Sequence, residues 1–257
     1  MRTSHKEMRR KINAEVSKIT DEELFSSAAF AAYLTDIAEA VTKRYKRRLR
    51  VETIYDTSEN AMIACTNNRN ILINTGNYIS QSMPYRKLKA ESILGLVGHE
   101  VGHMLFTNFR ISETYFSELS YGRLYPQMEL SEEEQESFTE VTDYFKTGTE
   151  AQKQAIRKAA KLLLNILEDA YIEARICDRY TGRFATGIHL NNIRFTEMMP
   201  SVTEQLTNGC YRFSVFCNLL NQYCRSGDIN NRDGYAGELL DLFYDVLPLV
   251  DDAIYDE

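Results

Sequence analysis

The chain has 257 residues, enough for one large domain or two small ones around a sizeable hydrophobic core. Hydrophobic residues make up 44% and charged residues 26%, as in soluble globular proteins, and no stretch approaches the ~20 apolar residues of a membrane span. The net charge of −7 argues against nucleic acid as a partner, and we interpret the dense basic run at residues 43–50 as a solvated helix end. We expect neither a nucleic-acid nor a membrane partner.

The cysteines indicate a reducing compartment. The chain has five, which is an odd number; none forms a C-x-x-C pair, and the basic N-terminus is not followed by the apolar segment of a secretory signal. Cys210, Cys217 and Cys224 recur every seven residues, which is the spacing of one buried helical face. We therefore expect reduced core thiols and a cytoplasmic location.

The beginning of the chain predicts an arm and then a long helix. Residues 1–20 are polar and basic, as in a short helix or arm. Thr20 and Glu23 form a capping-box signature for a helix whose apolar residues recur every three or four positions to about residue 48.

A small β-sheet is predicted next. Residues 51–55 begin a β region. Residues 61–66 and 70–75 flank the turn-forming pair Asn67-Asn68, so that they predict the two strands of a hairpin.

The helix that follows carries the most informative motif of the chain. Pro84 precedes a helix predicted at about residues 85–108, which contains the pattern H-E-x-x-H at His99, Glu100 and His103. Residues four apart share a helical face, so both histidines can bind one metal ion, with Glu100 beside them as a catalytic base acting on water. The alternative is a pair of histidines satisfied inside a buried helix.

The second half of the chain is predicted to be mostly helical. Residues 110–149 are polar and aromatic, and we interpret their acidic run at residues 132–136 as a solvated helical face. Further helices are predicted at residues 150–179, 210–225 and 236–248, separated by a loop with short elements at residues 183–208 that contains His189.

These elements together predict an α+β fold that is mostly helical, with a small sheet ahead of the motif helix. We expect a single domain over residues 1–257, with an N-terminal arm at residues 1–20 and a motif-bearing core at residues 50–180.

A catalytic zinc ion (Zn2+) needs a third protein ligand and an open position for water. The extended motif H-E-x-x-H-x-x-G-x-x-H would need glycine at position 106 and histidine at position 109. The chain has Phe106 and Phe109 instead, so this class of zinc site is excluded. The other common solution is a carboxylate from a second helix.

The helix at residues 150–179 offers three acids for this role, Glu168, Asp169 and Glu173. Carboxylates among aliphatic residues are costly to bury unless they are paired or bound to metal. Asp169 and Glu173 share a face with Asn165, whereas Glu168 lies on the neighbouring aliphatic face. The alternative is that these acids lie on a solvated face.

The H-E-x-x-H motif followed by N-I-L-E-D-A-Y-I-E at residues 165–173 resembles the gluzincin-like metallopeptidase domain that precedes von Willebrand factor A domains. Such domains occur in proteins similar to cobaltochelatase subunits and nitric-oxide-reductase activation proteins. The resemblance covers about residues 50–180 and implies a zincin-like fold, with an edge strand ahead of the active-site helix. It departs from the family because 257 residues leave no room for a von Willebrand factor A domain, which indicates a fragment or a stand-alone version.

The resemblance also implies roles for the acids. In gluzincin sites a carboxylate ligand is commonly followed four residues later by an acid that orients a metal-bound histidine, which makes Asp169 the ligand and Glu173 the orienting residue. The reverse assignment, with Glu173 as the ligand, comes second, and Glu168 comes third.

Two functions are compatible with these features. The first is a zinc-dependent metallopeptidase that hydrolyses protein or peptide substrates with Glu100 as general base. His189, Tyr171 or another tyrosine would stabilise the oxyanion. The second is a non-proteolytic zinc-binding module that works with a partner such as an ATPase or a von Willebrand factor A protein. The presence of Glu100 favours the enzyme, because a structural site needs no base.

Overall fold

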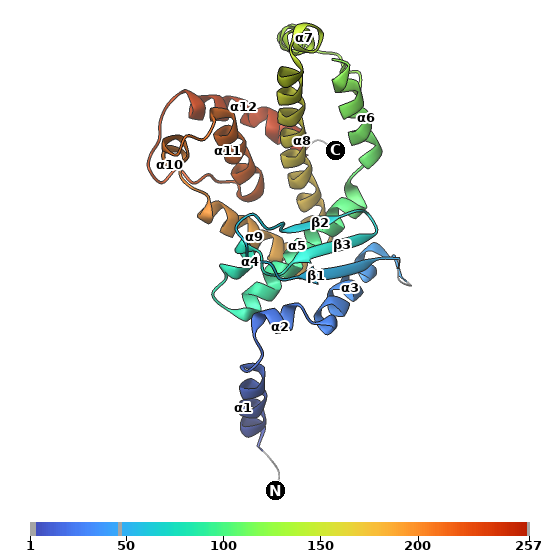
Figure 1. Ribbon diagram of the computed structural model, residues 1–257, viewed down its shortest axis with the longest axis vertical. Helices are drawn as coiled ribbons and strands as arrows, with labels where there is room; N and C mark the ends of the chain where they lie inside the picture. The colour runs from blue at the N-terminus through green and yellow to red at the C-terminus, as the bar shows by residue number, and fades with distance from the viewer. Residues whose placement is uncertain (1–3, 46–47, 256–257) are drawn as a thin grey trace. The chain divides into compact units, whose positions relative to one another are not determined.

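The computed structural model describes residues 4–45 and 48–255, and it is mostly helical with a three-stranded sheet (Figure 1). Contacts between residues divide the chain into two compact units. Unit 1 comprises Met1–Leu105 and Ile172–Met199, and unit 2 comprises Phe106–Tyr171 and Pro200–Glu257. The expectation of a single domain stays a prediction.

The elements of each unit are as follows. Unit 1 contains α1 (His5–Val16), α2 (Asp21–Phe25), α3 (Ala28–Thr42), β1 (Arg50–Ile54), β2 (Ala64–Thr66), β3 (Asn70–Asn74), α4 (Tyr78–Gln81), all but the last residue of α5 (Arg86–Phe106), and α9 (Arg183–Met198). Unit 2 contains α6 (Phe109–Ser120), α7 (Glu132–Thr147), α10 (Val202–Thr207), α11 (Arg212–Ser226) and α12 (Glu238–Tyr255). Helix α8 (Glu150–Arg179) is continuous, and the division falls within it, after Tyr171. Among the described residues, no helix is both long and apolar enough to cross a membrane.

The capping box predicted before α2 is confirmed. The hydroxyl oxygen of Thr20 accepts the backbone N–H of Glu23, and the Glu23 carboxylate accepts the backbone N–H of Thr20 at 2.8 Å. The expected single helix from this cap to about residue 48 is wrong. A new helix, α3, begins after Ser27 because the hydroxyl of that residue caps the backbone N–H of Phe30 at 3.1 Å.

Helix α3 ends at Thr42, where Lys43 adopts a left-handed conformation with φ of 57°. The basic run that follows lies partly outside the described residues, at positions 46 and 47. Within it, Arg44 donates hydrogen bonds to Asn68 at the strand turn and to the carbonyl of Met104 in the last turn of α5. This cation therefore complements the C-terminal end of α5, whereas the sequence predicted that it would complement the end of the helix preceding it in the chain.

The predicted hairpin is confirmed, and a third strand joins it. β2 pairs antiparallel with β3, and β1 pairs parallel with β3, which places β3 in the middle of the sheet. The turn forms because the Asn67 side chain accepts the backbone N–H groups of Arg69 and Asn70, and Asn68 tolerates a φ of 65°.

Helix α5 is the centre of unit 1, and α9 packs closely against it. A Cβ at Gly95 would lie 2.2 Å from the carbonyl carbon of Gly187, so the two backbones touch where both residues are glycine. Beside this crossing, the hydroxyl of Ser92 donates to the Asn191 side chain at 2.6 Å and lies 2.8 Å from the hydroxyl of Ser80 on α4. The loop predicted over residues 183–208 is therefore wrong: most of it is α9, whose Gly187 and Asn191 face α5 instead of solvent.

Unit 2 has a helical core of its own. Residues of α8, α10, α11 and α12 form one hydrophobic cluster, which includes Ile166 on α8, Leu219 on α11 and Phe243 on α12. The acidic run at residues 132–136 is exposed in the first turns of α7, as predicted. There its negative charge stabilises the N-terminus of the helix.

Candidate metal centre

The motif helix α5 is almost completely buried through its middle turns, and glycine permits this close packing. A Cβ at Gly98 would lie 2.9 Å from the ring of Phe184 on α9. A Cβ at Gly102 would lie 3.1 Å from Ile176 and 3.2 Å from Ile172, which belong to the part of α8 in unit 1. The glycines beside the two histidines therefore let α8 and α9 approach the histidine-bearing helix.

His99 and His103 project from neighbouring turns of α5. Their ring centroids are 4.9 Å apart and the ring planes meet at 81°. Both side chains are partly exposed, whereas Glu100 between them is 4% exposed. This is the arrangement that the H-E-x-x-H spacing predicts on one helical face.

Glu173 on α8 fixes the orientation of His99. Its Oε1 atom lies 2.7 Å from Nδ1 of His99, and its Oε2 atom accepts a hydrogen bond from Nδ2 of Asn192 at 2.6 Å. Since a carboxylate accepts hydrogen bonds, this contact places the imidazole proton on Nδ1 and directs the lone pair of Nε2 away from Glu173. Glu173 is 6% exposed and Asn192 is 4% exposed, so that bulk water competes little for these hydrogen bonds.

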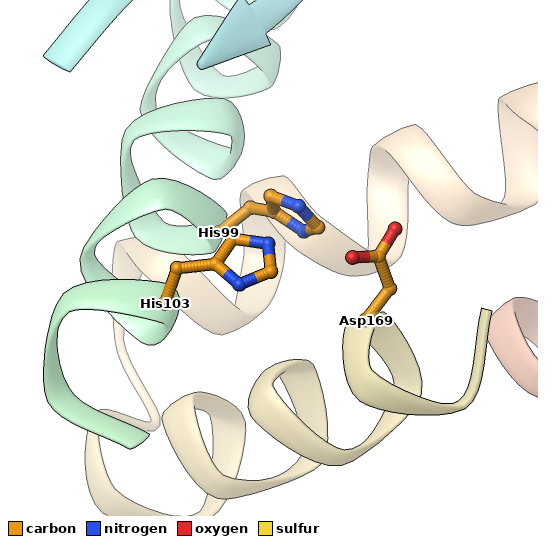
Figure 2. Close-up of side chains that lie close together, drawn as sticks. All are labelled: His99, His103 and Asp169. Atoms are coloured by element: carbon orange, nitrogen blue, oxygen red, sulfur yellow. The ribbon is translucent and has the colours of Figure 1, made fainter. Parts of the chain in front are cut away.

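Asp169 lies one helical turn before Glu173 on the unbroken helix α8. Each of His99, His103 and Asp169 offers one ligand atom, and these atoms all lie within 4.8 Å of one another. Figure 2 shows the two imidazole rings projecting from one helix and the Asp169 carboxylate from the other. Among the described residues, this is the group of histidine, cysteine and acidic side chains whose geometry could hold a metal ion.

The chemistry of this donor set fits zinc. Two imidazole nitrogens and one carboxylate oxygen are ligands that zinc accepts, with a fourth position open for water. Zinc bonds of about 2.0–2.2 Å separate tetrahedral ligand atoms by roughly 3.5 Å, so small side-chain rotations would close the group around an ion. The oriented His99 ring is a further feature of metal sites.

The other acidic candidates lie elsewhere. Glu168 is partly buried on α8 but does not belong to the group, and Asn165 is exposed. Glu173 contacts a histidine and is likewise outside the group. Of the three acids, Asp169 therefore belongs to the group that could hold a metal ion, and Glu173 contacts one of the histidines of that group.

Asn192 is a residue of the site that the sequence did not reveal. It lies on α9, in the segment that was predicted to be mostly loop. Helical periodicity could have found it. The apolar residues Phe184, Ala185 and Ile188 recur at helical spacing, and Asn192 continues the same buried face.

The edge strand β2 lies within electrostatic range of Glu100. Burial raises the pKa of the Cys65 thiol on β2, and the negative charge of Glu100 raises the pKa further. The strand β2 is at one end of the strand order β1-β3-β2. This places an unpaired strand edge within electrostatic range of the expected base.

The two candidates for oxyanion stabilisation differ in position. His189 is exposed on α9. Tyr171 follows Asp169 by two residues, a rotation of roughly 200° around the helix, so its side chain leaves α8 on a different face from the Asp169 carboxylate.

No protein-family model, no curated protein and no solved structure matches the chain.

Proposed function

We propose that the chain is a zinc-dependent metallopeptidase with a gluzincin-like site on α5 and α8. The observation that carries the proposal is the convergence of His99, His103 and Asp169 within 4.8 Å, with Glu173 hydrogen-bonded to Nδ1 of His99. A structural zinc site is normally closed by four protein ligands, whereas three ligands and a buried adjacent glutamate are typical of a catalytic site.

The roles of the protein residues follow from their positions. When bound, zinc lowers the pKa of a coordinated water and polarises the substrate carbonyl. The Glu100 carboxylate takes the proton that the attacking water releases and then donates it to the nitrogen of the departing amine. One peptide C–N bond is broken, and one carboxylate and one amine are formed. Glu173 holds His99 in one tautomer throughout.

The proposed substrate is an extended protein or peptide segment. Support comes from β2, which is paired with β3 along one side and carries Cys65, a residue within electrostatic range of Glu100. An extended chain can add to such an edge through backbone hydrogen bonds, which requires no particular side chain. Cytoplasmic action is proposed on the basis of the five cysteines, none of which forms a disulfide in the structure.

The test combines metal analysis with hydrolysis. The wild-type protein, purified without added metal, should contain one zinc per chain and cleave casein or members of a peptide library. Glu100→Gln should keep the zinc and the thermal stability but lose hydrolysis, because the amide cannot take up the proton. Glu168→Gln, which alters an acid outside the metal group, is the matched control and should retain both zinc and activity.

The outcomes separate the two functions. Wild-type turnover in Glu100→Gln would exclude this residue as the base. Stoichiometric zinc without hydrolysis in any of the proteins would instead favour the non-proteolytic module that acts with an ATPase or von Willebrand factor A partner. Absence of metal from the wild type would overturn both.

A further inference from the structure

The third candidate ligand is held by a residue from the C-terminal helices of unit 2. Nη2 of Arg225 on α11 donates a hydrogen bond to Oδ2 of Asp169 at 2.8 Å. Nε of the same guanidinium donates to Oδ1 of Asn221, one turn earlier on α11, at 2.7 Å. The side chains of Arg225 and Asp169 are only 20% and 24% exposed, so water screens this ion pair less than it screens a surface pair.

The helix that carries Arg225 is firmly placed. Its inward face is buried in the hydrophobic cluster of unit 2 through Val215, Leu219 and Leu220. Ile166, three residues before Asp169 on α8, belongs to the same cluster. The packing that fixes α11 therefore also fixes the turn of α8 from which Asp169 projects, and it keeps the guanidinium and the carboxylate in register.

We infer that Arg225 is a positioning residue for the metal ligand Asp169, an inference that rests on the proposed metal site. A carboxylate has two oxygens and about four lone-pair directions, so it can accept from Arg225 and still offer a lone pair to a metal ion. The guanidinium restricts the rotation of the short Asp169 side chain before metal binds. Metal binding then causes a smaller loss of side-chain conformational entropy.

This role gives the C-terminal helices a part in the metal centre that the sequence did not suggest. Arg225 lies 56 residues after Asp169 in the sequence. The planar fork of arginine can donate to Asp169 and Asn221 at once, whereas the single ammonium of lysine lacks this fixed geometry. The proposed positioning of Asp169 therefore requires arginine at position 225.

The experiment measures zinc affinity in the full-length chain by competition with a chromophoric chelator at one fixed pH. Arg225→Met, which keeps the aliphatic volume but removes the guanidinium, should bind zinc about 10–100-fold more weakly, the range expected for a group that orients a ligand. Arg225→Lys should lose less affinity than Arg225→Met. Arg212→Met is the matched control. Arg212 is the first residue of the same helix, and its Nη2 atom lies 2.8 Å from Oε2 of Glu238, which is not part of the metal group. This variant should leave the affinity unchanged.

A spectroscopic measurement separates positioning from general destabilisation. With Co2+ in place of zinc, the visible absorption bands should change in position or intensity in Arg225→Met and remain as in the wild type in Arg212→Met, because the bands report ligand geometry. Asn221→Ala, which removes only the support of Nε, provides a milder variant and should weaken binding in the same direction.

Wild-type affinity together with an unchanged cobalt spectrum in Arg225→Met would overturn the inference while leaving the metal site intact. Tighter binding in Arg225→Met would overturn it as well, since the arginine would then compete with the metal for Asp169. A wild-type chain that binds no metal would remove the proposed function and this inference together.

Discussion

The Oε1 atom of Glu173 lies 2.7 Å from Nδ1 of His99, so that the helix carrying the histidine motif is joined to α8 by a partly buried, charge-assisted hydrogen bond. This contact forms entirely within unit 1. It ties the orientation of one candidate metal ligand to a residue 74 positions later in the chain.

The first prediction concerns this contact. Glu173→Gln keeps the shape of the side chain but removes its charge, so the imidazole of His99 becomes a weaker ligand and zinc affinity should fall about 10–100-fold. Asn192→Ala should cause a smaller loss, because Glu173 would keep its bond to His99. Zinc competition titrations at constant pH check both values. Equal affinity of Glu173→Gln and the wild type would show that the hydrogen bond does not serve the metal.

The second prediction ranks the third ligand. Asp169→Ala removes a group that lies within 4.8 Å of both histidine ligand atoms, and it should cost more zinc affinity than Glu173→Gln. Glu168→Ala alters the adjacent acid, which is outside the group, and should bind zinc as the wild type does. Loss of the metal in Glu168→Ala alone would show that the assignment of Asp169 is wrong.

The third prediction tests the crossing of α5 and α9. Gly95→Ala would place a Cβ 2.2 Å from the backbone of Gly187, and backbone cannot move aside as a flexible side chain can. The free energy of unfolding should fall by about 3 kcal/mol or more, at or beyond the upper end of ordinary overpacking. Chemical denaturation measures this change.

Gly182→Ala is the matched control for this prediction. No atom lies within 4 Å of a Cβ at position 182, so an added methyl group would meet open space there. Its unfolding free energy should fall much less than that of Gly95→Ala. A similar small effect of Gly95→Ala would contradict the close contact between α5 and α9.

The fourth prediction concerns acid sensitivity at the start of α5. Burial tends to raise the pKa of Asp21, but hydrogen bonds and charge from Lys89 and Arg86 outweigh it and hold the pKa below the usual value of 3.8. Because the folded-state pKa is lowered, the stabilisation is fully present above the unfolded-state pKa. It is lost as the pH falls through the lower, folded-state value.

Asp21→Asn should therefore reduce the free energy of unfolding at pH 7 by about 1–2 kcal/mol, a figure that allows for the partial exposure of the three groups. The difference from the wild type should shrink as the pH falls below 3.8. Denaturation curves at several pH values measure it. Glu15→Gln, which breaks an exposed pair with Lys18, should change stability by less than about 0.5 kcal/mol. A pH-independent effect of Asp21→Asn would argue against an ionic origin.

The fifth prediction concerns the cysteines. Alkylation under denaturing, non-reducing conditions should modify all five, because none is paired in the structure. The expectation that Cys210 is a core residue is wrong, because it is exposed and precedes α11, which begins at Arg212. In the native protein Cys210 should therefore react early. Cys217 should react slowly, because it is buried and burial raises its thiol pKa to about 11. Mass spectrometry of timed samples checks the order, and fewer than five modifications after denaturation would reveal a disulfide.

The sequence by itself determined the features that depend on neighbouring residues. The capping box at Thr20, the turn at Asn67-Asn68 and the long helix α8 were all predictable, because each depends on bonds or periodicities within a few positions. The common face of His99 and His103 was predictable for the same reason, since the helical repeat fixes it.

Only the tertiary structure decided the features that depend on residues far apart in the chain. The segment of α9 looked like a loop because its glycines and asparagines are poor helix formers, yet the backbone contact at Gly187 and the buried bond of Asn192 to Glu173 require them there. Likewise, no local pattern could link Arg225 to Asp169. Such partners are selected by packing and by the need of a buried charge for a counter-charge, and both act between surfaces that the fold brings together.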